Sequence, residues 1–514
     1  MPTFGAKNLF LTRVNMANNI LYAFYDIKVN AASFDIGKYM VMAEQRRLLD
    51  KLDAIFVVIV PNGESWARSD DEHSAMQQKW RVNNILIPTL SVHPSLSGFT
   101  VCGSRAEAKK IEQSINAPVF PTGYSLDHPI SSFEWADMAA NAHENMPSIQ
   151  VDAEALEFVQ KWLNARCQDK LPVSITLREM GLEPHRNSNV DAWLKFANDL
   201  EDQDYFPIIL RDTALSMELP DERFDGLTLF SETTLNLELR AALYQLCYVN
   251  NFVANGPMEL CLFNTKVTYL YFAKHYDQDG NRLYQIPDYA LPHRGRFPVE
   301  APHQVMVWED DTYEFISGHF AQLTATLEAE KEEIASFKSK DYYPPSSTSP
   351  LVYLDLLASA CRVRQVDTIA RRLEKENVIT ADFSMYQRGR ARISNHDNSE
   401  AIAMLQAAIE LNDGDAYYWQ SIGVAYIKNG DLDAGIDHLK SALKIAPDKI
   451  DLLVSTCMTL HTAGRFDEAE VIARDCLEKG IKHTAIYEIL SDICRLNGDL
   501  KSAIEFQLAG QTGN

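Results

Sequence analysis

A spacing of 34 residues near the C-terminal end constrains the fold of this chain more than any other feature. Three glycines share this interval: Gly430, Gly464 and Gly498. Small residues recur in step with them: Ala401, Gly435, Ala469 and Ala503. A repeat of this length holds two amphipathic helices, with Gly at the turn between them and small residues where the helices touch. Residues 351–514 are therefore predicted to form an all-α solenoid.

One repeat carries a recognisable set of residues: Trp419, Gly423, Tyr426, Ala442 and Pro447. The region thus resembles a tetratricopeptide array, with three clear repeats, a weaker copy from about residue 381 and helical residues 351–378 before it. Later copies have Cys457 and Ser491 at the consensus glycine. The resemblance implies a face that binds proteins or peptides. Packing on the rest of the chain, or self-association of two subunits, are alternatives.

Composition describes a multidomain globular protein and excludes several classes. The 514 residues are 46% hydrophobic, enough for several cores. Asp and Glu number 71 against 48 Lys and Arg, a formal charge of -23 without a basic block, so nucleic acid is not an expected partner. The eight cysteines show no CxxC pair, which favours the reducing cytoplasm. The longest obvious apolar run, residues 54–60, is too short to span a membrane.

Residues 19–272 alternate short apolar runs with longer amphipathic segments, which is typical of parallel sheets covered by helices. Strands are expected at 20–25, 54–60, 99–102, 119–121, 173–177, 206–210, 227–230, 249–254 and 267–272. Helices are expected at 34–52, 80–92, 105–115, 153–167, 190–200 and 235–247. Ser104 is expected to cap one helix and to form a capping box with Glu107.

The stretch YVNNFVANGPMELC, residues 248–261, carries the main functional signal. An apolar run stops at Asn255, Gly256 and Pro257, and a new apolar segment begins at Met258 as if opening a helix. N–H groups at the first turn of a helix suit a phosphate or diphosphate, and Gly256 would let the ligand approach the backbone. A nucleotide-sugar is the natural ligand, while a purely structural turn is the alternative.

The run Gly256-Pro257-Met258-Glu259-Leu260-Cys261 resembles the Gly-Pro-Met-His-Leu-Ala element of the heptosyltransferase-like branch of GT-B glycosyltransferases. That element holds the donor diphosphate. Glu259 stands in place of His, Asn255 lies near the position of a Ser or Thr, and no Asp precedes the glycine. The resemblance implies that Glu259 caps the helix or holds hydroxyl groups of the sugar or ribose, as in other GT-B members.

Polar residues follow several predicted strands, where ligands lie in open parallel sheets. Arginine suits a diphosphate because its planar fork forms bidentate, charged hydrogen bonds. Residues 176–179 also resemble the strand-Arg element of fucosyltransferase-like enzymes, which implies a diphosphate contact for Arg178. An ion pair with Glu179 or Asp212 is the alternative for each arginine. The predicted donor-binding residues are Arg178, Arg186, Asn187, Arg211, Glu232, Asn255, Gly256, Pro257, Met258 and Glu259.

A carboxylate near the acceptor would remove a proton in an inverting transfer. Asp26, directly after the first strand, is the better-placed candidate, and Asp35, at the start of the next helix, is the second. Turn or capping roles are the alternatives. Residues 309–311 (Glu-Asp-Asp) are expected to cap a helix rather than to bind metal, so no metal or cofactor is predicted. The sequence has neither a GxSxG elbow nor a Walker loop.

Together these features predict a two-lobed, Rossmann-like α/β part of the GT-B type followed by the solenoid. The expected ranges are 1–126 for the acceptor-side lobe, 127–150 for the crossing, 151–300 for the donor lobe, 301–341 for a returning helix, 342–350 for a linker and 351–514 for the repeats. The predicted function is metal-independent transfer of a sugar from a nucleotide-sugar to a protein or glycan. The alternative is an interaction protein whose α/β domain is non-catalytic or resembles an epimerase.

Overall fold

The computed structural model describes residues 19–63, 74–130, 145–274 except 182 and 214, 301–344, and 350–512 except 360–362, 376 and 394–396. The chain divides into two compact units, residues 1–348 and 349–514. Parts of the predicted crossing and linker, and nearly all of the Pro-, Arg- and Tyr-rich stretch 280–302, lie outside the described residues.

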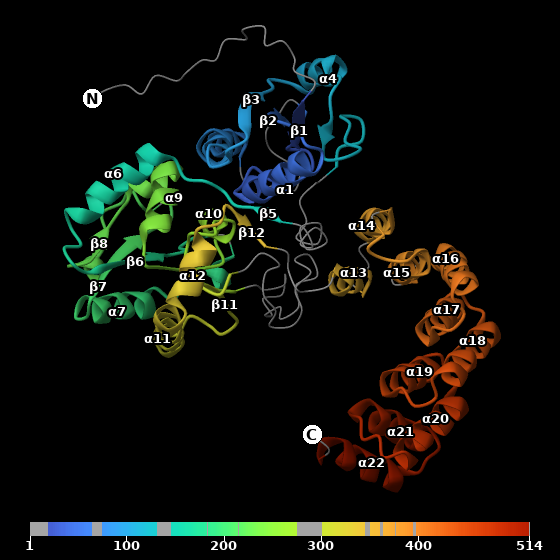
Figure 1. The fold of residues 1–514 in the computed structure, drawn as a ribbon. Helices are drawn as coiled ribbons and strands as arrows, with labels where there is room; N and C mark the ends of the chain where they lie inside the picture. The colour runs from blue at the N-terminus through green and yellow to red at the C-terminus, as the bar shows by residue number, and fades with distance from the viewer. Residues whose placement is uncertain are drawn as a thin grey trace. The chain divides into compact units, whose positions relative to one another are not determined.

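The first sheet has four parallel strands in the order β3-β2-β1-β4 (Figure 1). The strands are β1 Ile20–Asp26, β2 Ala54–Val60, β3 Leu96–Val101 and β4 Val119–Phe120, and helices α1 Asp35–Leu49 and α4 Arg105–Ser114 follow β1 and β3. The predicted helix at 80–92 is instead divided into α2 Ala75–Arg81, a π-helical turn Val82–Leu86 and α3 Ile87–Leu90. The division lies beside Pro88, which has no N–H for the regular helical bond.

Ser104 caps α4 as predicted, because its hydroxyl accepts a hydrogen bond from the Glu107 N–H at 3.2 Å. The predicted capping box is not formed. The Glu107 carboxylate accepts from the Gly103 N–H at 2.7 Å, one residue earlier than a capping box requires.

The second sheet has six parallel strands in the order β11-β10-β9-β6-β7-β8. Their bounds are β6 Leu171–Thr176, β7 Tyr205–Leu210, β8 Thr228–Leu229, β9 Val249–Val253, β10 Tyr269–Phe272 and β11 Gln304–Val307. Read from the β8 edge to the β11 edge, the strands are the third, second, first, fourth, fifth and sixth of this sheet in chain order. The direction of winding therefore reverses between the neighbours β6 and β9, and this switch point is where such sheets bind ligands.

Helices cover both faces of the second sheet (Figure 1). Helices α6 Ala153–Asn164 and α9 Leu237–Leu246 lie on one face, and α7 Val190–Glu201 and α11 Tyr313–Ala329 lie on the other. Val159 and Ile208 belong to the core on the first side, and Trp193 and Ile175 belong to the core on the second. Both faces are therefore buried, and the polar side chains of the central strands are hydrogen-bonded inside the sheet, as between the Ser174 hydroxyl and Asn250 Oδ1 at 2.6 Å.

Residues 301–341 do more than form the expected returning helix. They supply the edge strand β11, which the sequence analysis missed, and α11. Helix α12 Lys331–Lys338 then leads to β12 Tyr342–Tyr343, which pairs antiparallel with β5 Met146–Pro147. Tyr343 is 2% exposed, and its hydroxyl donates to the Leu262 carbonyl at 3.0 Å. The first two residues of the predicted linker therefore belong to the α/β unit.

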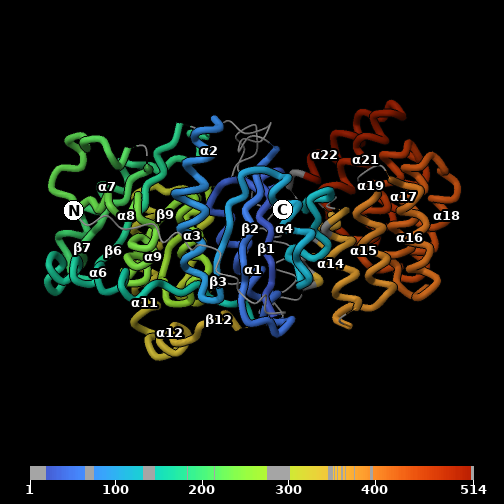
Figure 2. The backbone as a smooth tube through the Cα atoms, turned by 90° about the horizontal axis from the view of Figure 1, so that it is seen from above, coloured from blue at the N-terminus to red at the C-terminus, as the bar shows by residue number. Residues whose placement is uncertain are grey.

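The second unit is a succession of helices, and Figure 2 shows α15 to α18 following one another side by side. Its helices are α13 Pro350–Ser359, α14 Val363–Lys375, α15 Ala381–Ile393, α16 Asn398–Leu411, α17 Ala416–Lys428, α18 Leu432–Ile445, α19 Ile450–Thr462, α20 Phe466–Glu478, α21 Thr484–Leu496 and α22 Leu500–Thr512. Gly430, Gly464 and Gly498 have φ of +92°, +74° and +78°, the left-handed helix cap that favours glycine. Among the described residues, no helix is long and apolar enough to cross a membrane.

The consensus glycine position faces a backbone carbonyl of the next helix. A Cβ on Gly423 would lie 2.9 Å from the Gly435 carbonyl oxygen, so that copy requires glycine. In the next two copies the side chain binds the equivalent carbonyl instead. The Cys457 thiol donates to Ala469 at 3.3 Å, and the Ser491 hydroxyl donates to Ala503 at 2.9 Å.

Candidate functional site

Residues from both sides of the switch point meet in the second sheet. Arg178 follows β6, and Arg186 lies in the short 3₁₀ turn Pro184–Arg186 that comes next. Arg186 Nη2 donates to the carbonyl oxygen of Ala254, at the end of β9, over 3.5 Å. Asn255 follows at once and is 8% exposed. The structure thus brings together Arg178, Arg186 and Asn255, as the sequence analysis expected.

One carboxylate stands between the two arginines. Glu183 Oε2 lies 2.6 Å from Arg186 Nη1 and 3.6 Å from Arg178 Nη2. Glu183 has φ of +51°, which is uncommon for a residue other than glycine, and its side chain is 42% exposed. Burial, then the neighbouring Arg186, lowers the pKa of Arg178. The arginines therefore hold an anionic group here, and the group is an exposed side chain.

Two buried donors at this place lack an acceptor among the described residues. They are the Nε of Arg186 and the Nδ2 of Asn255. Buried polar groups are nearly always hydrogen-bonded, so such donors point to an acceptor that the protein does not supply. Together with the two positive charges, they suit an oxyanion such as a phosphate group.

The elbow itself differs from the expectation. The helix that follows is short, consisting of the 3₁₀ turn Gly256–Met258 and α10 Glu259–Leu262. The Met258 N–H is taken by the Asn255 side chain at 3.1 Å, and Pro257 has no N–H. A Cβ on Gly256 would lie 2.5 Å from Phe34 Cδ2. The residue is therefore glycine because the Phe34 ring packs against it, and the predicted cradle of first-turn N–H groups is wrong.

Glu259 meets the first lobe through an ion pair. Its Oε1 lies 2.8 Å from Lys38 Nζ, and both side chains are at most 4% exposed. Lys38 Nζ also lies 2.8 Å from Asp35 Oδ1, whereas Glu259 Oε2 has no hydrogen-bond partner among the described residues. The Asp35 side chain is 45% exposed. Two carboxylates from different lobes thus share one lysine.

The shared lysine does not act equally on the two carboxyl groups. Burial raises the pKa of Glu259 to about 7, although the nearby ammonium of Lys38 lowers it. Burial also raises the pKa of Asp35, but Lys38 and the Ser33 hydroxyl, 2.6 Å away, outweigh this effect, and the net pKa is lowered. At neutral pH Asp35 is therefore ionised, and Glu259 is close to its midpoint.

Asp26, the first candidate for the base, is occupied elsewhere. Arg105 binds it in bidentate fashion at 2.8 and 2.9 Å, and the Tyr124 hydroxyl donates to it at 2.9 Å. The Lys28 N–H donates to it at 2.9 Å as well, and the side chain is fully buried. These are the surroundings of a structural carboxylate, because each oxygen already accepts hydrogen bonds.

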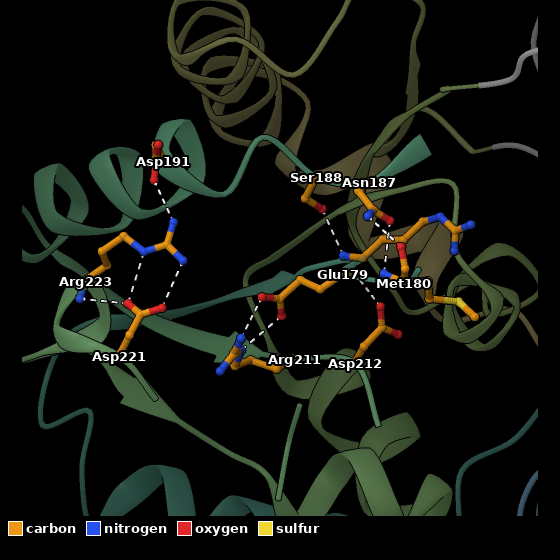
Figure 3. Close-up of polar contacts among 10 residues, drawn as sticks. Glu179, Met180, Asn187, Ser188, Asp191, Arg211, Asp212, Asp221 and Arg223 are labelled. Carbon is orange, nitrogen blue, oxygen red and sulfur yellow. Dashed lines mark hydrogen bonds and ion pairs between the residues drawn. The ribbon is translucent and has the colours of Figure 1, made fainter. Parts of the chain in front are cut away.

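Other predicted donor-binding residues also have structural partners (Figure 3). Arg211 binds both oxygens of Glu179 at 2.7 and 3.0 Å. The Asn187 amide donates to the Met180 carbonyl at 2.8 Å and accepts from its N–H at 3.0 Å, which closes the loop. Glu232 is exposed beyond β8 at the far edge of the sheet, three strands from β9.

A buried pair beside the site escaped the sequence analysis. Lys274, after β10, lies 2.7 Å from both the Asn187 carbonyl oxygen and Asp311 Oδ1. Asp311 Oδ2 accepts from the Asn189 N–H and from Trp193 Nε1. Thr312 caps α11, so the capping role predicted for Asp311 is wrong. The position of Lys274, two residues after the end of β10, was the available signal.

Comparison with known proteins concerns the repeats. Residues 386–450 match the family model for the tetratricopeptide repeat. The C-terminal helical region therefore contains tetratricopeptide repeats. The array is similar to solved structures of MamA (15% identity, TM-score 0.26, 30% of this chain and 94% of MamA) and of YrrB, described as "a TPR protein with an unusual peptide-binding site" (15%, 0.26, 37% and 91%).

A third similar structure is the Cut9–Hcn1 hetero-tetramer of the APC/C, with 12% identity, a TM-score of 0.28, and 32% of this chain and 31% of that chain covered. No curated protein matches the chain. Among the described residues, no cluster of three or more His, Cys, Asp or Glu side chains is arranged to hold a metal ion.

Proposed function

We propose that the α/β unit is a GT-B-type glycosyltransferase that uses a nucleotide-sugar and needs no divalent cation. The observation that carries the proposal is the meeting of Arg178, Arg186 and Asn255 at the switch point of the six-stranded sheet. A diphosphate there would accept hydrogen bonds from the buried Arg186 Nε and Asn255 Nδ2, and it would displace the Glu183 carboxylate. Its negative charge would be balanced by the two guanidinium groups.

The arrangement of the two sheets supports a two-lobed enzyme. Helix α1 follows β1 at the carboxyl end of the first sheet, and the elbow follows β9 at the carboxyl end of the second. Lys38 of α1 and Glu259 of α10 are in contact. The carboxyl ends of both sheets therefore open toward one shared region, where a donor on one lobe would meet an acceptor on the other.

Asp35 is the better candidate for the base in this reaction. It lies in the shared region, its side chain is 45% exposed, and its lowered pKa keeps it ionised. In the proposed step Asp35 takes the proton of the acceptor hydroxyl, whose oxygen bonds to the anomeric carbon of the sugar. The bond from that carbon to the diphosphate breaks, and the electron pair leaves with the diphosphate, where Arg178 and Arg186 stabilise the charge.

The tetratricopeptide repeats indicate a role in protein interaction. For a transferase, they would recruit a protein acceptor or an assembly that carries one. The alternative is an interaction protein whose α/β unit only binds a nucleotide-sugar or epimerises it. Transfer of a labelled sugar from the nucleotide-sugar to an acceptor separates these cases, because neither binding nor epimerisation attaches the sugar to a second molecule.

The test begins with melting curves of the full chain in a panel of nucleotide-sugars. The nucleoside diphosphate of the best donor is then titrated by calorimetry. Arg178→Ala should weaken its binding about 10- to 100-fold, since a charge-assisted hydrogen bond contributes roughly 1.5–3 kcal/mol. Arg223→Ala is the matched control, because Arg223 is half-exposed and paired with Asp221 and Asp191. Equal affinity in the two variants would place the ligand elsewhere and refute the proposal.

A further inference from the structure

We infer that the first turn of α1 is a gate over the switch-point site, closed by the ion pair between Lys38 and Glu259. The inference deepens the proposed function, because the ligand that the gate would admit is the proposed donor. The contact itself is a property of the described residues and can be tested without any ligand.

The gate residues lie on one face of α1. Phe34, Gly37 and Lys38 are spaced as neighbours on a helix surface. The Phe34 ring lies against Gly256, a Cβ on Gly37 would lie 3.7 Å from Glu259 Cβ, and Lys38 Nζ is 2.8 Å from Glu259 Oε1. A single helical turn therefore covers the elbow from Gly256 to Glu259, and small residues on both sides allow the close approach.

Lys38 would keep a counter-ion, Asp35, after separating from Glu259. Its ammonium already lies 2.8 Å from Asp35 on the same helix, so that ion pair would travel with α1 when the lobes part. Glu259 gains from opening as well, because its Oε2 has no hydrogen-bond partner among the described residues in the closed contact. Water would satisfy both oxygens once the contact opens. Apolar packing between α1 and α10 also holds the closed contact, and the desolvation cost of the ion pair offsets part of the strength that it adds.

The first turn of α1 covers the place into which a bound donor would extend. A nucleotide-sugar has a nucleoside on one side of its diphosphate and a sugar on the other. A diphosphate bound by Arg186 and Asn255 would therefore direct one of these groups over Gly256, which is the next residue along the elbow. Phe34 now covers that residue. Entry of the whole donor requires the first turn of α1 to move away.

The experiment compares two opening variants with one control in the full chain. Lys38→Met removes the charge but keeps most of the side-chain stem, and Phe34→Ala removes the ring from Gly256. Arg46→Met is the control, because Arg46 lies near the other end of α1 and pairs with Asp50 of the same segment at 2.7 Å. Amide hydrogen exchange is followed over residues 34–40 and 254–262. Association rates of ADP, GDP, UDP and CDP are measured by stopped flow.

Both opening variants should exchange these amides at least about tenfold faster than wild type and bind the preferred nucleotide faster, while Arg46→Met behaves as wild type. Unchanged exchange in Phe34→Ala and Lys38→Met would overturn the gate. Faster exchange with unchanged association would also overturn it, because the contact would then not control entry. Binding of none of the four nucleotides to any variant, despite faster exchange, would reject the donor site itself. Phe34→Ala keeps the test decisive if Lys38→Met fails to fold.

Discussion

Both oxygens of the Glu179 carboxylate are held by the guanidinium group of Arg211, at 2.7 and 3.0 Å. Arg178, the residue before Glu179, instead lies beside Glu183 and Arg186. Adjacent residues in one loop thus have different tasks. One anchors the loop to the end of β7, and the other faces the switch point between β6 and β9.

Arg211 should contribute to stability rather than to nucleotide binding. Replacing it with Ala should lower the melting temperature of the α/β unit, because Glu179 would remain about 90% buried without its counter-ion. Loss of one partner of a buried pair typically costs about 3–5 kcal/mol. Calorimetry on the folded variant should show nucleoside diphosphate affinity within about twofold of wild type. A stable Arg211→Ala protein that no longer binds the nucleotide would show that Arg211 contacts the ligand.

Glu183→Gln should increase affinity for a nucleoside diphosphate. The Glu183 carboxylate pairs with Arg186 and approaches Arg178, so an incoming anion must compete with it. Removing one exposed negative charge should strengthen binding roughly three- to tenfold, equivalent to about 1 kcal/mol. The measurement is a calorimetric titration at low salt. Glu222→Gln, an exposed position near β8, is the control, and equal effects of the two changes would indicate only a general charge effect.

The pH dependence of stability should change in Glu259→Gln. Burial raises the pKa of Glu259 from 4.5 to about 7, so between these values the folded protein holds a proton that the unfolded chain releases. The associated stability is present below about pH 4.5 and is lost as the pH rises through 7, by an amount on the order of 3 kcal/mol. Melting temperatures of wild type and variant should therefore differ in their pH slope within this window. Parallel curves would contradict the raised pKa.

Turnover should persist without a divalent cation. Positive charge for the leaving diphosphate would come from Arg178 and Arg186, so no metal is needed to neutralise it. Release of nucleoside diphosphate is measured after treatment with EDTA and again after adding Mg²⁺ or Mn²⁺. Activity that disappears with the chelator and returns with the metal would rule out this mechanism.

Removal of all residues after Pro350 should leave nucleotide affinity nearly unchanged while weakening action on a macromolecular acceptor. The chain divides into compact units at residues 348 and 349, and separate units usually keep their own cores. Calorimetry measures the affinity, and transfer to protein acceptors in a cell extract measures the second effect. A truncated protein that cannot fold would show that the repeats complete the α/β core.

The repeats could be predicted in detail because each one is a local unit. Gly430 and its equivalents adopt the left-handed cap that their spacing indicated. Apolar runs likewise located most strands, since β2 matches its expected bounds in full. Strand β11 was missed because it is short and precedes a much stronger helical pattern. Strand β12 was missed because its Tyr pair lies in a Pro- and Ser-rich stretch, and only the contacts of Tyr343 with Leu262 explain it.

The site was predictable only as far as sheet topology determines it. The rule that ligands lie after parallel strands correctly grouped Arg178, Arg186 and Asn255. It could not show that Arg211 forms an ion pair with Glu179 or that Asp26 forms one with Arg105, because both ion pairs depend on which long side chains meet in space. The role of Gly256 was misjudged for the same reason. Its neighbour is Phe34, which lies more than two hundred residues away in sequence.

The thiol of Cys457 can report when the repeat formed by α19 and α20 opens. It replaces the consensus glycine, is fully buried, and donates to the Ala469 carbonyl on the facing helix. Burial raises the pKa of this thiol to about 12, so it does not react while α19 and α20 stay together. An alkylating reagent can modify it only in the intervals when the two helices separate. The rate at which the Cys457 thiol is alkylated therefore measures how often α19 and α20 separate within the intact array.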